Sequence, residues 1–542
     1  AVKGLGGYHL AADARWEEAV HALRARKHRE DRPFAVMVAD VAAARALADV
    51  SDSEEALLTS AARPIVLVRR RGPGVVAASV APGQQSLGLL LPYTALHHLL
   101  LAAVGGPLVL TSGNVSDEPI AYDDTDAATR LAPIADAFLT SDRPIQTRVD
   151  DSVLRVVRGR PLPLRRSRGY VPLPVPLAED CPRPILACGP ELKNTLCLAR
   201  GRQAFVSHHI GDLENFETFR SYLDAIAHLE RLLDITPAVV AHDLHPEYLS
   251  TKHALTLAGV DLVAVQHHHA HIASCLADNG AGGPVIGVAF DGLGMGADGT
   301  LWGGEFLIAD LAGYERAAHL APVPMPGGVA AIRQPWRMAA AHLDAAYGAD
   351  VPVSLDVRQR QGRRWSDVLA AAHAGINSPL TSSVGRLFDA VAAIVGLRDE
   401  VTYEGQAAVD LEQCAAPGDH GTYPVDVREG DPLVADTASL VRAVAEDVAR
   451  GVPASIVSAR FHTTLAHVVV DVCARLRAAR GLSTVALSGG VFQNVRLLEL
   501  CIDELEATGF EVLTHGRVPP NDGGISLGQA AVAAARDRAT TA

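Results

Sequence analysis

The residues best suited to hold a metal ion lie in the segment 266–274, QHHHAHIAS. If this segment is helical, His267 and His271 stand one turn apart on the same face, and both imidazoles can reach one ion. Two imidazoles leave a metal under-coordinated, so carboxylate oxygens must complete the set. Asp291, after an apolar strand, and Asp522, at the entrance of a helix, are the best candidates. This set suits Fe2+, Zn2+ or Mn2+; the alternatives are a histidine cluster without metal and an N-cap role for Asp522.

Two glycine-rich segments have the composition of nucleotide-binding turns. In the turn 291–300, DGLGMGADGT, Gly292 and Gly294 let backbone N–H groups approach phosphate oxygens closely. This turn lacks the GKS of a Walker loop and the acidic spacing of an EF-hand, and a plain tight hairpin is the alternative. In VALSGGVFQN, Gly489 and Gly490 lie between a strand and a helix, where a phosphate could meet the helix N-terminus. Both segments are therefore candidate nucleotide sites.

A third candidate site, in the first third of the chain, has residue types that a triphosphate needs. Seven arginines crowd residues 148–168, and arginine offers phosphate a bidentate fork. A solvated charged strand and an RNA-binding surface are the alternatives for this cluster. Basic residues near a predicted helix end and the segment TSGN at 111–114 could converge on the same pocket. The candidates for this ATP site are Lys27, Arg29, Ser112, Asn114, Arg148 and Arg155.

The elements that must position these residues fall on either side of a proline-rich segment at 169–184. Its prolines are expected to prevent ladder pairing and to form a stiff, extended connector. Before it, helix-like stretches alternate with strand-like ones, which favours one α/β domain. After it, a strand–turn–strand pattern occurs at 185–199 and again at 285–308, which indicates the duplicated fold of the actin and sugar-kinase class. Helices are expected at 333–346, 383–395, 437–449, 461–480 and 525–538.

Composition and charge narrow the class of protein. The 542 residues are 49% hydrophobic and 20% charged, as in ordinary globular proteins. A net charge of −14 argues against a general binder of nucleic acids or of anionic membranes. Seven cysteines without a CxxC pair, the lack of a signal peptide and the lack of an apolar run of transmembrane length predict a cytoplasmic protein.

Ordered motifs along nearly the whole chain resemble the HypF-type hydrogenase maturation carbamoyltransferases. Among them are KGLGGYHLA, TSGNVSDEPI, RRSRGYVP, CGPELKNT, SHHIGDLEN, VQHHHAHIAS, FDGLGMGADGTLWGGEF, SSVGRLFDA, SGGVFQN and PPNDGGISLGQA. Residues 1–172 resemble the YrdC family, a twisted α/β domain whose KxR and TSxN elements match four of the candidate ATP-site residues. After a linker at 173–184, residues 185–542 resemble the TsaD-type proteins of tRNA threonylcarbamoylation, whose HxxxH metal pair would be His267 and His271.

The resemblance implies a reaction in two steps. With ATP and Mg2+, the YrdC-like domain would convert carbamate, supplied as such or from carbamoyl phosphate, into carbamoyl-adenylate. The TsaD-like domain, with one Fe2+ or Zn2+ ion, would transfer the carbamoyl group to the C-terminal cysteine of a HypE-type partner. The resulting thiocarbamate would then be dehydrated to the cyanide ligand of nickel–iron hydrogenase.

Three of the resembling motifs, CGPELKNT, SSVGRLFDA and SGGVFQN, add residues to the predicted site. The catalytic set becomes Lys27, Arg29 and Lys193. The nucleotide-binding residues of the larger domain also include Gly385, Asp389 and Asn494. Because no cysteine has an obvious nucleophile context, direct transfer to the acceptor is expected, with Cys188 and Cys197 as the alternative relay.

The chain also departs from the family pattern. Full-length members carry an acylphosphatase-like domain and a CxxC zinc-finger region ahead of the YrdC-like domain, and we expect this chain, which begins at Ala1, to be a fragment without them. Val329 replaces a usual aspartate, so this position is left outside the predicted site. An O-carbamoyltransferase acting on a small-molecule hydroxyl and a tRNA-binding threonylcarbamoylation-type protein are the alternative functions; domain order disfavours the first and acidic charge the second.

Overall fold

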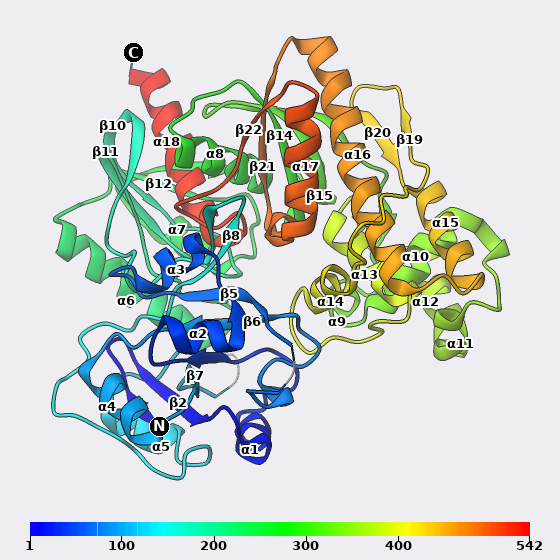
Figure 1. The fold of residues 1–542 in the computed structure, drawn as a ribbon. Coiled ribbons are helices and arrows are strands. Elements are labelled where there is room, and N and C mark those ends of the chain that lie inside the picture. The colour runs from blue at the N-terminus through cyan, green and yellow to red at the C-terminus, as the bar shows by residue number, and fades with distance from the viewer. Residues whose placement is uncertain (73, 116–117, 542) are drawn as a thin grey trace. The chain divides into compact units, whose positions relative to one another are not determined.

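The computed structural model describes residues 1–72, 74–115 and 118–541, and the chain forms two compact units (Figure 1). The first unit comprises Ala1–His242, Pro246–Val263 and Gly516–Ala530. The second unit comprises Asp243–His245, Ala264–His515 and Ala531–Ala542. Both units combine helices with strands, so the α/β class predicted from the sequence is confirmed.

The N-terminal part of the first unit is built on a mixed sheet with the strand order β1-β2-β7-β3-β6-β5-β8-β9, and β4 pairs with β5. Its strands are β1 (Val2–Lys3), β2 (Tyr8–Asp13), β3 (Ala35–Met37), β4 (Ala48–Asp49), β5 (Ile65–Arg70), β6 (Ser86–Leu90), β7 (Leu108–Ser112), β8 (Val153–Val157) and β9 (Arg160–Arg165). Its helices are α1 (Glu17–Lys27), α2 (Val41–Leu47), α3 (Asp52–Thr59), η1 (Ala78–Val80), α4 (Ala95–Val104) and α5 (Asp124–Arg130).

Helices cover both faces of this sheet. Successive side chains of a strand point to opposite faces, and apolar side chains on each face pack against a helix. On one face, Leu10 of β2 packs in the same core as Val20 and Leu23 of α1. On the other face, Leu110 of β7 packs with Leu101 of α4. The two layers agree with the α/β class expected for the residues before the proline-rich segment.

The rest of the first unit carries a smaller sheet with the order β11-β10-β12-β13. Its elements are β10 (Val175–Ala187), β11 (Cys197–Val206), α6 (Phe216–Leu233), β12 (Val239–Asp243), α7 (Leu249–Thr256) and β13 (Asp261–Val265). Strand β10 pairs antiparallel with β11, so the expectation that the prolines prevent ladder pairing was wrong. The register shifts between Cys181 and Ile185, where Pro182 and Pro184 lie, so irregularity in the ladder accommodates the prolines.

The second unit contains a sheet with the order β19-β20-β16-β15-β14-β21-β22, to which β17 and β18 are added at β15. Its strands are β14 (Val285–Met295), β15 (Leu301–Ala309), β16 (Tyr314–Leu320), β17 (Val323–Pro324), β18 (Leu380–Thr381), β19 (Asp426–Arg428), β20 (Leu433–Asp436), β21 (Thr484–Ser488) and β22 (Glu511–Leu513). Its helices are α8 (His267–Asn279), α9 (Val329–Arg333), α10 (Pro335–Tyr347), η2 (Gly348–Asp350), α11 (Asp356–Gln361), α12 (Arg363–His373), α13 (Val384–Ile394), α14 (Gln406–Cys414), α15 (Ala438–Ala449), α16 (Ala454–Arg480), η3 (Gly490–Gln493) and α17 (Val495–Ala507). Near the C-terminus the chain adds η4 (Asp522–Gly524) and α18 (Ile525–Thr541).

The two hairpins of the duplicated plan, β10/β11 and β14/β15, share one topology. Each is antiparallel, and the first strand of each pairs in parallel with a later strand, β12 for β10 and β21 for β14. The glycine-rich segment is shorter as a turn than expected, because β14 continues to Met295 after a register shift between Phe290 and Gly294. The repeated strand plan confirms the duplication predicted from the sequence.

The helices expected after the glycine-rich segment all occur, with shifted ends. Helix α16 begins at Ala454, a turn and more before the expected start at residue 461. By length and composition α16 could cross a membrane, but 72% of its apolar window is buried inside the protein, as in a core helix. Among the described residues it is the single helix that meets this test.

Candidate functional site

The two predicted metal-binding histidines lie in the first turns of α8, as expected. The side chain of Gln266 caps this helix by accepting a hydrogen bond from the His269 N–H, and Gly280 ends it in a left-handed conformation. His267 and His271 are almost fully buried, and their ring centroids are 5.1 Å apart. The helix therefore presents two imidazoles side by side, one turn apart.

Asp291 faces both imidazoles from strand β14. Its Oδ2 atom lies 3.6 Å from His267 Nε2 and 3.7 Å from His271 Nε2, and its Oδ1 accepts a hydrogen bond of 2.8 Å from the Gly490 N–H. One potential ligand atom from each of the three residues lies within 4.8 Å of the others. Burial alone would raise the pKa of Asp291, but the two histidines hold it well below its usual value. The carboxylate is thus kept ionised, as a metal ligand must be.

A second buried carboxylate, which the sequence did not single out, orients the first histidine. His267 Nδ1 lies 2.8 Å from Oδ2 of Asp243, which is fully buried at the end of β12. An ionised carboxylate only accepts hydrogen bonds, so Nδ1 carries a proton, and when the ring is neutral Nε2 offers its lone pair to a metal. This carboxylate–histidine pairing is typical of metal sites. The available signal was an apolar strand, VVAHD, that ends in an aspartate.

The donor set fits a transition metal. Two neutral imidazole nitrogens and a carboxylate oxygen are ligands that Fe2+, Zn2+ and Mn2+ share. Asp522 lies in η4, and its neighbour Asn521 takes the N-cap role by accepting a hydrogen bond from the Gly523 N–H. The N-cap alternative for Asp522 was therefore wrong. Asp522 belongs to the first unit, and its part in the metal set stays a prediction.

The predicted nucleotide turns of the second unit meet around Asp291. Gly489 has φ +102°, and a Cβ there would lie 2.2 Å from the Phe290 carbonyl oxygen, so only glycine permits this turn. A Cβ on Gly385 would lie 2.9 Å from Gly292 Cα. The turns that carry Gly292, Gly385 and Gly489 are thus close-packed against one another.

Gly294 serves the histidines rather than a turn. A Cβ at this position would lie 2.5 Å from Cδ2 of His267 and 2.6 Å from Cε1 of His268. The residue lies within β14 and pairs with Trp302 of β15, so it is not at the tip of the hairpin. Because Gly294 has no side chain, the imidazoles of His267 and His268 fit beside the strand.

Three further predicted residues have structural partners. Asn494 caps α17 by accepting a hydrogen bond from the Leu497 N–H, and its Nδ2 lies 2.9 Å from His462 Nε2. Asp389 is buried on α13, where Nη1 of Arg386 lies 2.6 Å away, and burial raises its pKa to about 6 despite this cation. Lys193 has φ +47° in the turn after β10, and its N–H donates to Asp212 Oδ1 over 2.8 Å.

In the first unit, the predicted ATP-site residues Lys27, Ser112 and Asn114 lie in direct contact. Lys27 ends α1, is 2% exposed, and its Nζ donates to the carbonyl oxygens of Ser112 (2.8 Å) and Asn114 (2.7 Å) and to Asn114 Oδ1 (2.5 Å). Ser112 Oγ donates to the same Asn114 Oδ1 over 2.8 Å. Burial, and then the charge of Arg29, lowers the pKa of Lys27 to about 7. A buried cation of this kind is suited to an anionic ligand.

Arg24, which the sequence did not single out, holds the loop after α1. It is 6% exposed, and its guanidinium donates to the carbonyl oxygens of Ser79, Arg29, Glu30, Arg32 and Val80. The predicted residue Arg29 also folds onto this loop, where Nη2 donates to the Pro33 carbonyl oxygen over 2.7 Å. The loop that follows Lys27 is therefore fixed by two guanidinium groups.

The seven arginines at 148–168 do not act as one group. Arg166 donates to the carbonyl oxygens of Val206, Tyr170 and Leu173, and Arg168 donates to Asp151 and to two further carbonyl oxygens. These two side chains hold the backbone in place. Arg148 lies over the Tyr122 ring at 4.9 Å, and burial lowers its pKa. Arg155 is half-buried on β8.

Comparison with known proteins gives one answer for the whole chain. The family model described as "Telomere recombination" (Sua5, yciO, yrdC) matches residues 1–167, "HypF Kae1-like domain" matches 180–278, and "Carbamoyltransferase, Kae1-like Domain, second subdomain" matches 287–529. Carbamoyltransferase HypF2 of Cupriavidus necator is 44% identical over 99% of this chain and 71% of its own length. The chain belongs to the HypF family of carbamoyltransferases. The resemblance read from the motifs is confirmed.

Further comparisons with HypF proteins agree. Carbamoyltransferase HypF of Rhizobium leguminosarum is 44% identical over 98% of this chain and 70% of its own length. A crystal structure of full-length HypF in its phosphate- and nucleotide-bound form has a TM-score of 0.94 and 43% identity, and covers 98% of this chain and 84% of that one. The chain is therefore a carbamoyltransferase with a YrdC-like domain followed by Kae1-like domains, as expected.

The cysteines considered as relays in this HypF-family enzyme are poorly suited to the role. Cys188 and Cys197 are fully buried. Burial raises the pKa of the Cys188 thiol to about 12 and that of Cys197 further. A thiol must ionise to attack a carbonyl group, so both side chains are inert at neutral pH.

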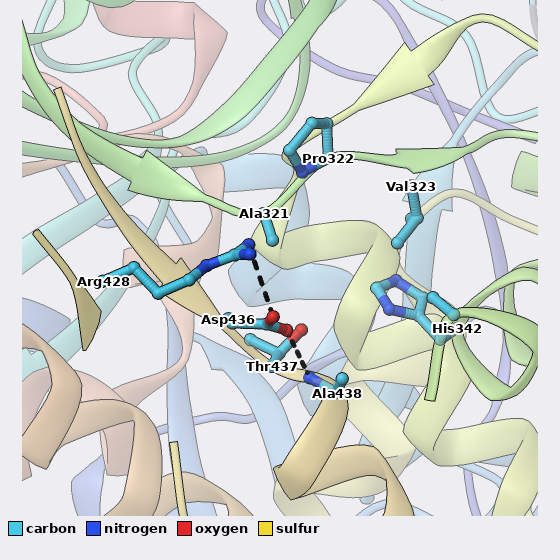
Figure 2. A pocket seen from close by; sticks show the side chains of 9 residues that line it. Ala321, Pro322, Val323, His342, Arg428, Asp436, Thr437 and Ala438 are labelled. Carbon is cyan, nitrogen blue, oxygen red and sulfur yellow. Dashed lines mark hydrogen bonds and ion pairs between the residues drawn. The ribbon is translucent and has the colours of Figure 1, made fainter. Parts of the chain in front are cut away.

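A pocket of about 190 Å3 in the second unit lies apart from the predicted site residues (Figure 2). It is lined by residues 321–323, by His342 and Ala345 of α10, and by residues around the start of α15. Figure 2 shows Arg428 reaching toward Asp436, and these side chains form an ion pair of 3.3 Å. Since the charged lining groups neutralise one another, the pocket has no excess charge to attract an ionic ligand.

Proposed function

We propose that this chain makes carbamoyl-adenylate from ATP and carbamate and then transfers the carbamoyl group to a protein thiol. Adenylation belongs to residues 1–172, and transfer belongs to residues 185–542, beyond a connecting segment at 173–184. The acceptor is the C-terminal cysteine of a HypE-type protein, and the product leads to the cyanide ligands of nickel–iron hydrogenase. One observation carries the proposal: a single HypF-family chain contains both a buried lysine, Lys27, bonded to Asn114 and a cluster of histidines and aspartates suited to a metal.

In the first step, a carbamate oxygen attacks the α-phosphorus of Mg2+-bound ATP and pyrophosphate leaves. Lys27, Arg29, Arg148 and Arg155 neutralise and orient the triphosphate, because charge-assisted hydrogen bonds to phosphate are the strongest available. Lys27 is held beside Ser112 and Asn114, which supply polar groups at the end of β7. Carbamate reaches this site as such or after conversion of carbamoyl phosphate.

In the second step, the acceptor thiolate attacks the carbamoyl carbon and AMP leaves. His267, His271 and Asp291, with Asp522 as a fourth ligand, would hold one Fe2+ or Zn2+ ion, and the bound ion would supply Lewis-acid polarisation of the adenylate. Asp243 fixes the imidazole of His267, and the Gly490 N–H fixes the carboxylate of Asp291. These contacts keep the donor atoms in place before the substrate arrives.

The nucleotide of the second step lies against the turns around Gly292, Gly385 and Gly489. Gly292, Gly489 and Gly490 provide backbone close to the nucleotide, and Asp389 and Asn494 flank it. Gly294, which also belongs to the predicted set, makes room for the histidines beside it. The related full-length HypF crystallised in a nucleotide-bound form, which supports nucleotide binding by this chain. Lys193 is the remaining catalytic candidate. Transfer is direct: the two candidate relays, Cys188 and Cys197, are fully buried, and burial raises the pKa of both thiols.

The proposed function is tested with the acceptor protein itself. This chain, ATP, Mg2+ and carbamate or carbamoyl phosphate are incubated with a HypE-type acceptor, and the C-terminal peptide of the acceptor is analysed by mass spectrometry. One carbamoyl group on the C-terminal cysteine supports the proposal, and an acceptor whose cysteine is replaced by serine is the control. Labelling of a small-molecule hydroxyl or of tRNA in place of the peptide would instead support one of the alternative functions.

A further inference from the structure

A buried cation beside the second-step site has no role in the reaction as described so far. Arg386 is the third residue of α13 and is 4% exposed. Its Nη1 lies 2.6 Å from Asp389 Oδ2, which balances its charge. Nevertheless, its Nε–H and Nη1–H groups make no hydrogen bond with any residue that the structure describes. A guanidinium has five N–H donors in a fixed plane, and leaving them buried without acceptors is costly.

The position of Arg386 explains what such donors could meet. Helix α13 is capped by Ser383, whose Oγ also donates to the carbonyl oxygens of Asp291 (2.8 Å) and Gly292 (2.5 Å). A Cβ on Gly292 would lie 3.8 Å from Nη2 of Arg386. The guanidinium therefore lies beside the backbone of Gly292, one residue from the carboxylate that faces the two histidines.

The hydrogen-bond donors of the guanidinium indicate that its ligand is an oxyanion. A planar guanidinium binds best to a group with several acceptor oxygens in one plane or face, and phosphate and carboxylate are such groups. The carboxylate of Asp389 lies close without hydrogen-bond geometry to Nη1, so the fork still has donors to offer. Phosphate also matches the turn at Gly292, which lies beside the guanidinium, because glycine lets backbone N–H groups come close to phosphate oxygens.

We propose that Arg386 binds the phosphate of the nucleotide at the second-step site, with Asp389 holding its guanidinium in position. The identity of that nucleotide as an adenylate rests on the proposed function. When the carbamoyl group departs, AMP gains negative charge on a phosphate oxygen, and a fixed guanidinium beside it stabilises that charge. The residue then contributes to the transfer step and to the selection of nucleotides over nucleosides.

The experiment compares binding of AMP, adenosine and inorganic phosphate by isothermal titration calorimetry. All chains carry Lys27→Ala, so that the first-step site does not contribute to the signal. With Arg386 intact, AMP binds more tightly than adenosine. Arg386→Gln weakens AMP binding about 10- to 100-fold, the range for a hydrogen bond to a charged group, and leaves adenosine binding unchanged. Arg386→Lys, which keeps the charge without the fork, loses part of the AMP affinity.

The control variant is Arg360→Gln. Arg360 pairs with Asp399 and donates to the Ala393 carbonyl oxygen of α13, so it supports the same helix from its other end. This variant should leave the ratio of AMP to adenosine affinity unchanged. If Arg386→Gln weakens adenosine as much as AMP, or if it changes neither, the inference is wrong and the ion pair is only structural.

Competition by inorganic phosphate distinguishes a site that binds phosphate alone from a site that needs the whole nucleotide. If phosphate competes with AMP and loses affinity in Arg386→Gln, the residue is a phosphate site whichever molecule delivers the group; if it does not compete, the site needs the nucleoside as well. Both results support the inference. Normal AMP binding together with an acceptor that is never carbamoylated would refute the proposed function and leave this inference standing.

Discussion

His267 Nδ1 and Asp243 Oδ2 lie 2.8 Å apart, and both side chains are fully buried. The aspartate ends strand β12, the histidine begins helix α8, and together they fix which imidazole nitrogen is available to a metal. Such a carboxylate partner also holds the orientation of the imidazole ring. Metal binding in this enzyme should therefore depend on a residue that touches no metal.

We predict that Asp243→Asn lowers metal affinity by about 10- to 100-fold, the usual effect of removing such a partner. The amide can present its N–H in place of an acceptor oxygen, so the tautomer of His267 is no longer enforced. Metal titration of the apo-protein measures the effect. Asp261→Asn, at an exposed ion pair with Arg183, is the control and should bind metal as the wild type does.

Gly294→Ala should also weaken metal binding, for a steric reason. The new Cβ would lie 2.5 Å from Cδ2 of His267, and the imidazole must move by several tenths of an ångström to relieve the clash. Gly313→Ala, where a Cβ meets nothing within 4 Å, is the matched control. Equal metal stoichiometry and affinity in the two variants would show that Gly294 does not support the site.

Lys27 should make stability depend on pH in a characteristic direction. Its pKa is about 7 in the fold against 10.5 in the unfolded chain, so the unfolded state binds more protons between these pH values. The wild type therefore gains stability as pH rises from 7 to 10, by about 1.4 kcal/mol per pH unit at most. Lys27→Met lacks this gain.

Denaturant unfolding at several pH values tests the prediction. The stability of Lys27→Met relative to the wild type should fall as pH rises through this window. Lys252→Met removes an exposed lysine paired with Glu247 and should show a constant difference. A constant difference for Lys27→Met as well would mean that the buried ammonium keeps its ordinary pKa.

Replacing Cys188 and Cys197 together by alanine should leave acceptor carbamoylation nearly unchanged. Burial keeps both thiols protonated, so neither can form a carbamoyl-enzyme intermediate at neutral pH. The double variant is assayed for transfer after circular dichroism has shown that it folds. Loss of transfer with normal pyrophosphate release would establish a cysteine relay.

Much of the two candidate sites could be predicted from the sequence, because their residues lie in short segments with strong local patterns. The spacing of His267 and His271 on an apolar helix, and the aspartate after the strand VIGVAF, are read from neighbouring residues. The lysine cluster followed from two short motifs, KxR and TSxN, although their contact spans more than 80 residues of sequence.

The roles that could not be predicted depend on contacts between distant segments. Asp243 lies 24 residues before His267, and although its strand, VVAHD, ends in an aspartate, nothing in that strand identifies the histidine with which it pairs. Arg166 and Arg168 look like a phosphate clamp in sequence but hold carbonyl oxygens, since backbone acceptors do not show in a pattern of residue types. Pro182 and Pro184 fall where the ladder of β10 shifts, and a bulge is not visible before the partner strand is known.

The division of labour between the two sites is the central claim, and one reaction measures it. Pyrophosphate and carbamoylated acceptor are quantified together for the wild type, for Lys27→Ala and for the double variant His267→Ala with His271→Ala. We predict that Lys27→Ala yields neither product, while the double histidine variant has lost its metal, still releases pyrophosphate and yields no carbamoylated acceptor. Pyrophosphate release by Lys27→Ala, or carbamoylated acceptor from the metal-free histidine variant, would contradict the account.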